Sequence, residues 1–250
     1  ALAGLPGARL VSPAAAQDAE PVPGGVLYMS LADDDVQSFD PIVPSDNMSI
    51  WTMLLIYDQL IRVAPDGVSL EPGLAESWEK SEDGLTYTFQ LRQTNFHDGT
   101  PCTADDVVYC INRVVTDEAS GWAFLFSAVD TVTAQDPQTV VITLKQIWVP
   151  FESDLALFGA SIISRAMHEA QGEALFQAPV GTGPFMFDSW EKGSSIRLLK
   201  NPNYWDAGKP YLDELNFMVL TDANARMLQF QGGDLDIATD VPFSQLDALR

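Results

Sequence analysis

Basic residues are scarce in this sequence, with 13 Lys and Arg against 35 Asp and Glu among 250 residues, so the formal net charge is −22. Contacts to nucleic-acid phosphates need clustered Lys and Arg, and this balance therefore argues against a nucleic-acid-binding protein. It argues equally against docking on an anionic membrane surface. The acidic residues are spread along the chain, which we interpret as a solvated surface, with steering of a cationic partner as the alternative.

Histidine and cysteine are also scarce, with two of each. His97 and His168 lie far apart and form no metal-binding pair, and we expect His97 to stabilise a turn. Cys102 directly precedes a helix expected to begin at Thr103, and Cys110 lies within that helix, about 12 Å away along its axis. A disulfide requires Cα atoms within about 7 Å, so we predict that these two cysteines do not pair with each other.

Long apolar runs are absent, since no stretch of about 18 uninterrupted apolar residues is found, and we expect no membrane span. Residues 1–16 are small and apolar and end in an A-x-A-like cleavage site, which is typical of the end of a secretory signal peptide. We interpret residues 1–23 as a signal-peptide remnant and leader, and we expect the protein to be exported.

What the sequence does contain is enough apolar material, 46%, for a folded core. Segments with strand and helix patterns alternate without internal repeats, which predicts a mixed α/β fold with antiparallel hairpins. The predicted strands are 25–31, 74–78, 85–91, 132–134, 140–144, 194–200, 215–220 and 236–239. The predicted helices are 49–61, 103–115, 150–158, 166–171 and 224–231.

No catalytic constellation is found. Cys102 or Cys110 with His97 is conceivable as a nucleophile and base, but buried and inert cysteines are the better interpretation. Residues 181–185 lack the third glycine of a dinucleotide-binding loop. The acidic run Asp33–Asp35 could hold a cation, but we interpret it as solvated. We therefore expect a binding protein with no enzymatic activity, no cofactor and no metal.

Eight short motifs follow one another in order along residues 24–250, and most of their residues form turns and caps. They include Pro72-Gly73-Leu74-Ala75-Glu76-Ser77-Trp78, Phe96-His97-Asp98-Gly99-Thr100-Pro101 and Asn201-Pro202-Asn203-Tyr204-Trp205. Together, in this order, they resemble the solute-binding proteins of ABC importers, in the dipeptide/oligopeptide/nickel-binding family, family 5. The resemblance implies a periplasmic-binding-protein type II-like lobe with an inserted α+β extra domain, truncated before the second lobe. The incomplete main lobe would comprise residues 24–58 and 161–250, and the extra domain residues 59–160.

The resemblance also implies a function. Members of this family close two lobes on a ligand. We expect a monomeric periplasmic receptor that captures a short peptide and delivers it to an ABC permease in the inner membrane. A non-peptide cargo, such as an oligosaccharide, a nickel chelate or an opine-like solute, is the alternative within the class. A secreted hydrolase is the alternative from another class.

Candidate ligand-binding residues follow from the same resemblance. In peptide-binding relatives the loop after the first strand lies along the ligand, which here points to Ser45, Asp46 and Asn47. A carboxylate there could hold a peptide amine, and the backbone could pair with the peptide as an added strand. The alternative is that Asp46 only caps the following helix. Trp122 is the aromatic candidate in the extra domain, with a core position as its alternative.

Overall fold

The computed structural model describes residues 21–31, 34–43 and 46–242. Ser45, Asp33 and residues 1–20 of the expected signal-peptide remnant and leader lie outside the described residues. Within the described ranges no helix is long and apolar enough to cross a membrane.

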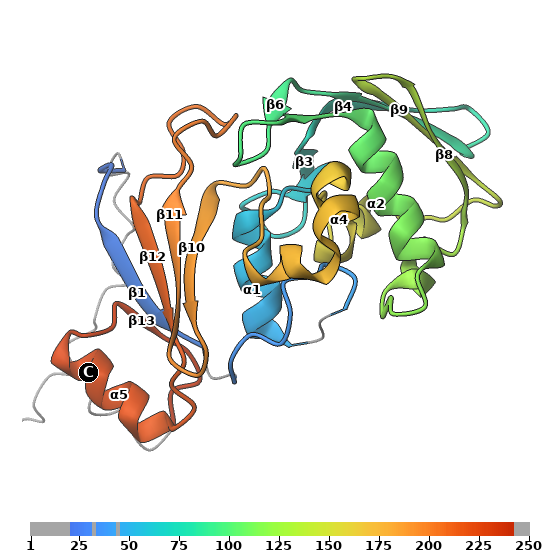
Figure 1. Ribbon diagram of the computed structural model, residues 1–250. Coiled ribbons are helices and arrows are strands. Elements are labelled where there is room, and N and C mark those ends of the chain that lie inside the picture. The colour runs from blue at the N-terminus through green and yellow to red at the C-terminus, as the bar shows by residue number, and fades with distance from the viewer. Residues whose placement is uncertain (1–20, 32–33, 44–45, 243–250) are drawn as a thin grey trace, which may run out of the picture.

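A five-stranded mixed sheet forms one side of the molecule (Figure 1). Strands β10, β11 and β12 follow one another as an antiparallel meander, whereas β1 pairs in parallel with both of its neighbours. The order across the sheet is β10 (Phe185–Glu191), β11 (Ser195–Lys200), β12 (Glu214–Met218), β1 (Val26–Ser30) and β13 (Ile237–Ala238). Helix α1 (Asn47–Ile56) packs against β10, and α5 (Ala223–Gly232) connects β12 to β13.

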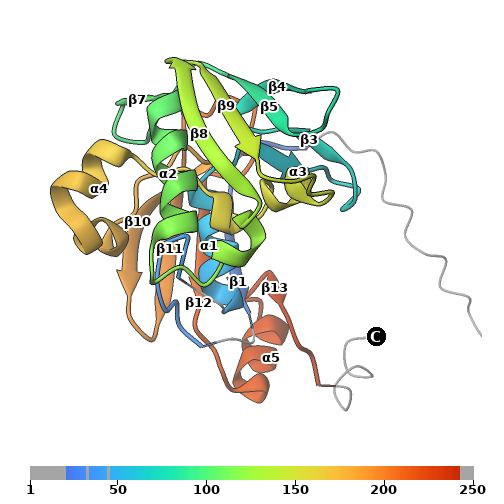
Figure 2. The ribbon, with the colours of Figure 1, turned by 90° about the vertical axis from the view of Figure 1, so that its right-hand side faces the viewer.

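A second, four-stranded antiparallel sheet forms the other side (Figure 2). Helix α2 (Ala104–Thr116) lies across β8 and β9, because Val107, Ile111 and Val114 recur on one of its faces and are buried there. The order is β4 (Ala75–Lys80), β5 (Thr86–Leu91), β9 (Thr139–Leu144) and β8 (Val129–Asp136). Two small hairpins adjoin it: β2 (Ile61–Val63) with β3 (Leu70–Pro72), and β6 (Thr94–Asn95) with β7 (Pro101–Cys102).

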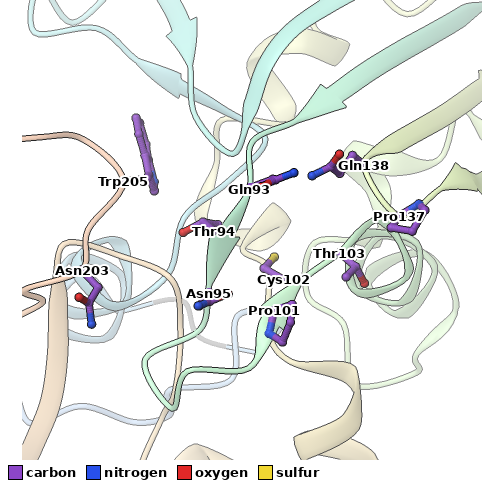
Figure 3. Close-up of a pocket in the computed structure, with 10 residues that line it drawn as sticks. All are labelled: Gln93, Thr94, Asn95, Pro101, Cys102, Thr103, Pro137, Gln138, Asn203 and Trp205. Atoms are coloured by element: carbon purple, nitrogen blue, oxygen red, sulfur yellow. The ribbon is translucent and has the colours of Figure 1, made fainter.

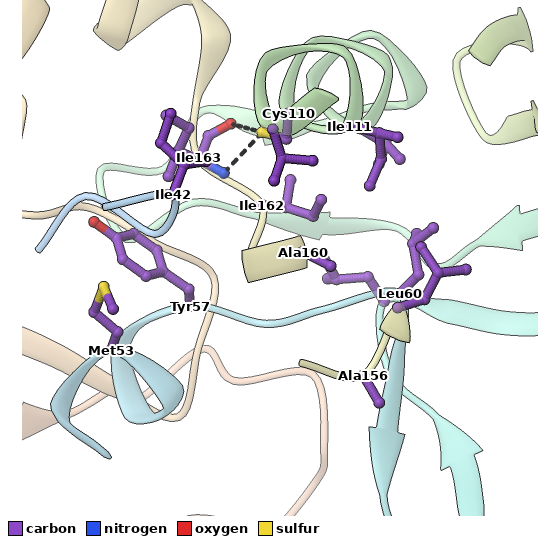
Figure 4. Close-up of a cluster of buried hydrophobic side chains, with 14 of the residues drawn as sticks. Ile42, Met53, Tyr57, Leu60, Cys110, Ile111, Ala156, Ala160, Ile162 and Ile163 are labelled. Carbon is purple, nitrogen blue, oxygen red and sulfur yellow. Dashed lines mark hydrogen bonds between the residues drawn. The ribbon is translucent and has the colours of Figure 1, made fainter. Parts of the chain in front are cut away.

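Short helices lie among the segments that connect the strands. They are the α-helices α3 (Phe151–Asp154) and α4 (Arg165–Gln171) and the 3₁₀-helices η1 (Ala123–Phe126), η2 (Phe158–Ala160) and η3 (Gly172–Gln177). Figure 4 shows part of the core, where the Cys110 thiol contacts the backbone N–H and C=O of Ile163 at 3.3 and 3.5 Å. Cys102 and Cys110 are both buried and unpaired, which confirms that they form no disulfide with each other.

The structure corrects the helix expected over 49–61. It begins at Asn47 and ends at Ile56, because the next residues are extended and the Leu60 carbonyl accepts from the N–H groups of Gly73 and Ala75. Although the sequence of this helix is mostly apolar, its Leu54 is 40% exposed. The helix expected over 150–158 is shorter, α3 alone followed by η2, and strand β10 was not predicted.

Candidate functional site

The loop after β1 and the aromatic segment that follows α2 lie side by side. The N–H of Gly121 donates to the carbonyl of Ile42 at 2.9 Å, which joins the residue before Trp122 to the loop that leads to Asp46. Two regions that are about 80 residues apart in the sequence therefore meet, as the candidate site requires.

Asp46 caps α1. Its Oδ1 accepts from the N–H of Ser49 at 2.8 Å, so the capping interpretation applies to this oxygen. Its Oδ2 is buried and has no hydrogen-bond partner among the residues that the structure describes, so the carboxylate retains one acceptor that they do not use. Asn47 is the first residue of α1 and is exposed.

Trp122 is half-buried, so its side chain is partly a core residue and partly exposed for contact with a ligand. One side of its indole packs edge-on against Phe158, with ring centroids 4.8 Å apart. A Cβ on Gly159 would lie 3.2 Å from the Trp122 side chain, so the glycine permits this close packing. Phe124, whose ring centroid is 6.2 Å away, is 62% exposed, and Val43 is 44% exposed. The segment therefore presents an apolar rim next to the Asp46 loop.

A buried ion pair fixes this loop. The Arg113 guanidinium on α2 donates from Nη1 and Nη2 to the two carboxylate oxygens of Asp40, both at 2.6 Å. The hydroxyl of Tyr57 donates to the carbonyl of Phe39 at 3.0 Å, and burial raises the pKa of Tyr57, which keeps it a donor. Sequence reasoning missed this pair, because Asp40 and Arg113 are 73 residues apart and match no motif of known spacing.

A second buried carboxylate lies where the chain passes from one sheet to the other. Asp58 accepts from Thr182 Oγ1 at 3.0 Å, from Tyr204 Oη at 3.1 Å and from Trp205 Nε1 at 3.0 Å. Burial raises the pKa of Asp58, and these hydrogen bonds act against that rise. The Arg92 guanidinium lies 3.7 Å from the centroid of the Trp205 ring.

His97 joins its own turn to the loop at Gly181–Gly183, so it does more than stabilise a turn. Its Nδ1 accepts from the Gly181 N–H at 3.2 Å, and its Nε2 lies 3.0 Å from the Gly183 carbonyl, to which it donates as the neutral ring. The backbone N–H of His97 donates to the Gly181 carbonyl at 2.8 Å. Burial lowers the pKa of His97 and so favours the neutral form.

Asp35 and the second histidine have partners within the described ranges. No group of three or more His, Cys, Asp or Glu side chains is placed there to hold a metal ion. Asp35, in the acidic run, accepts from Trp190 Nε1 at 2.9 Å and from the Gly193 N–H at 2.6 Å, so it fixes a turn. His168 lies 2.6 Å from the hydroxyl of Tyr109.

A cavity of about 560 Å³ lies elsewhere, at the β6–β7 hairpin, and no predicted site residue lines it (Figure 3). It is lined by Gln93, Thr94, Asn95, Pro101, Cys102, Thr103, Pro137, Gln138, Asn203 and Trp205. These residues come from several separate segments of the sequence, so no local pattern could have indicated them.

The chain matches the family model "Bacterial extracellular solute-binding proteins, family 5 Middle" over residues 69–250. It is 37% identical over 240 residues to the "Probable D,D-dipeptide-binding periplasmic protein DdpA" of Escherichia coli, which covers 92% of this chain and 46% of that protein. It is 33% identical to the glutathione-binding protein GsiB of Pectobacterium atrosepticum, over 99% of this chain and 47% of that protein.

Solved structures agree with these matches. The periplasmic binding protein DppA of Helicobacter pylori, in complex with the peptide STSA, superposes with a TM-score of 0.85 at 30% identity, over 92% of this chain and 49% of that chain. AgaA of A. tumefaciens, in complex with agropinic acid, gives a TM-score of 0.85 at 33% identity, over 88% and 45%.

These superpositions confirm the predicted mixed α/β fold of the periplasmic binding proteins. The chain spans about half the length of the curated relatives it matches. Because the family model covers most of the chain, the resemblance predicted from the motifs is confirmed, and the chain belongs to family 5 of the bacterial extracellular solute-binding proteins.

Proposed function

We propose that this chain is the N-terminal half of a periplasmic receptor of an ABC importer, which captures a short peptide and delivers it to a permease in the inner membrane. The observation that carries the proposal is the buried Oδ2 of Asp46, which has no partner within the described ranges, beside the apolar rim at Trp122. Relatives named for dipeptides and glutathione support a peptide-like cargo. The receptor acts as a monomer without enzymatic activity, through different affinities of its open and closed states.

In this proposal residues 24–58 and 161–250 form the main lobe and residues 59–160 form the extra domain. The cargo lies between the main lobe and a second lobe. Its ammonium group pairs with the Asp46 carboxylate, whose buried Oδ2 becomes accessible when the cargo binds and then forms a charge-assisted hydrogen bond. Ser45 and Asn47 contribute backbone groups, and the Trp122 ring packs against a side chain of the peptide.

The substitution Asp46→Asn in the complete receptor tests this assignment. Asparagine is as good an N-cap as aspartate, so we expect little change in melting temperature. The lost charge should weaken binding of free dipeptides and tripeptides about tenfold, measured by calorimetry, with a smaller effect on their N-acetylated forms.

Asp222→Asn is the matched control. Asp222 caps α5 in the same way, with Oδ1 accepting from the Ala225 N–H at 2.7 Å, but it is remote in sequence from the loop. Peptide affinity should be unchanged in this variant. Equal effects of the two substitutions would contradict the role of Asp46, and hydrolysis of the peptides would overturn the receptor function.

An opine-like cargo is the second candidate, because AgaA with bound agropinic acid is as similar in fold as the peptide-bound DppA. A receptor for such a solute would show a rise in melting temperature with agropinic acid and none with peptides.

A further inference from the structure

The cavity at the β6–β7 hairpin has a lining unlike that of the Asp46 loop (Figure 3). None of its ten lining side chains is charged. Six of the ten carry neutral hydrogen-bonding groups, namely the amides of Gln93, Asn95, Gln138 and Asn203 and the hydroxyls of Thr94 and Thr103. The amide ends of Gln93 and Gln138 face each other in Figure 3.

The backbone beneath these side chains is fixed. The carbonyl of Gln138 accepts from the Leu91 N–H at 2.7 Å, and the N–H of Asn203 donates to Asn201 Oδ1 at 2.9 Å. Trp205 is fixed by its bond to Asp58 and by the Arg92 guanidinium on its ring. In contrast, the four side-chain amides form no hydrogen bond within the described residues, so their donors and acceptors are free for a ligand.

The charges near the cavity favour an uncharged ligand. Thr103 lies at the N-terminus of α2, which would ordinarily attract an anion. Here Asp105 and Asp106 occupy the first turn, and the Asp106 carboxylate accepts from the N–H and the hydroxyl of Thr103 at 2.9 and 3.0 Å. This compensates the positive end of the helix, while the cavity itself offers a cation no carboxylate.

We propose that this cavity binds a neutral polyhydroxylated molecule, of about the size of a disaccharide, at a site separate from the cargo site. Each side-chain amide can donate and accept at once, which matches the hydroxyl groups of a sugar. Pro101, Pro137 and Trp205 supply apolar surface for its C–H groups. The volume of about 560 Å³ lies within the range of small-molecule sites.

Calorimetric titration of the complete receptor with maltose and with trehalose tests the proposal, in the absence and presence of saturating peptide. We expect binding of at least one of the two sugars, and at least tenfold weaker binding in the double variant Gln93→Ala/Asn203→Ala, because two exposed amides are removed. Gln231→Ala, an exposed amide on α5, is the control and should leave the affinity unchanged.

Peptide affinity and melting temperature of the double variant should equal those of the wild type, which separates this site from the proposed cargo site. Three results would overturn the proposal. They are the absence of binding of both sugars at ~20 mM, equal sugar affinity of the double variant and the wild type, or equally tight binding of glucosamine or glucose 6-phosphate.

Discussion

At the scale of single residues, the described part of the chain uses buried polar groups as connectors between segments that are distant in sequence. Asp58 and His97 each join residues of the first half of the chain to residues beyond position 180. Asp40 joins the loop before α1 to helix α2 through Arg113. Each of these side chains forms hydrogen bonds with several partners. Replacing one of these buried side chains would therefore leave the polar groups that now bond to it buried and unpaired.

His97 should make stability depend on pH. Burial lowers the pKa of the folded imidazole, while the unfolded chain takes up a proton near the usual value of 6.5. The free energy of unfolding should therefore be highest above that value and should fall as the pH drops below about 6.5. The variant His97→Asn should be less stable at pH 7.5 and should show a shallower decline between pH 7 and about 5.5 in urea unfolding.

His168→Asn serves as the comparison, because the imidazole of His168 is less deeply buried and its replacement should change the slope less. An identical slope in the wild type and in His97→Asn would refute the assignment.

At the scale of elements, the loop at Gly181–Gly183 is locked against the end of α1. The N–H of Gly183 donates to the Ile56 carbonyl at 2.9 Å, and a Cβ on Gly183 would lie 2.6 Å from the carbonyl carbon of Ile56. Only a residue without a side chain permits this approach, because real Cβ atoms do not come so close to backbone.

Gly183→Ala should therefore lower the free energy of unfolding by roughly 2–3 kcal/mol, measured by urea denaturation. Gly232→Ala is the control, since the nearest atom to its added Cβ is 3.7 Å away and the position is helical. That variant should be unchanged or slightly more stable, by up to about 1 kcal/mol. Equal losses in both variants would contradict the close-approach argument.

The helices and strands also show which secondary-structure elements could be predicted from the sequence. Helix α2 was predicted over residues 103–115, close to its observed bounds, because Thr103, the acidic first turn and the spaced apolar residues all indicate a helix here. Helix α1 ends five residues earlier than predicted, because residues 48–61 are apolar on nearly all sides and the spacing contains no end signal. Strand β10 was missed because a register shift between Phe187 and Ser189 interrupts its alternation.

The candidate site could likewise be predicted only in part from the sequence. Asp46 and Trp122 could be named from the family resemblance, but the Asp40–Arg113 pair and the Asp58 cluster depend on tertiary contacts over 73 to 147 residues. The side chains that line the amide-rich cavity are brought together only by the fold. Their spacing in the sequence therefore could not predict the cavity.

At the scale of the whole molecule, the two sheets are tied together at several points. The Ile162 N–H donates to the Asp58 carbonyl at 3.0 Å, and Gln59 Nε2 donates to Ser161 Oγ at 2.8 Å, so the outgoing and returning segments are paired. The Asp58 and His97 clusters add to these contacts.

We therefore expect the two sheets to unfold in a single cooperative transition. Hydrogen exchange of the complete receptor should give the amides of β9 and β11 the same opening free energy within about 1 kcal/mol. A four-stranded sheet that opens separately, at a clearly lower free energy, would contradict this coupling.

The pairing of Asp58 with Ile162 also bears on how such a molecule could arise in evolution. The two ends of the intervening segment are held side by side by this hydrogen bond and by the Gln59–Ser161 bond, so the segment of about a hundred residues begins and ends at nearly the same place. A gene segment encoding them can be gained or exchanged in a single recombination event without altering the pairing of the five-stranded sheet. Variation between lineages should therefore concentrate at this junction, with changes in the length and content of the segment between Asp58 and Ile162.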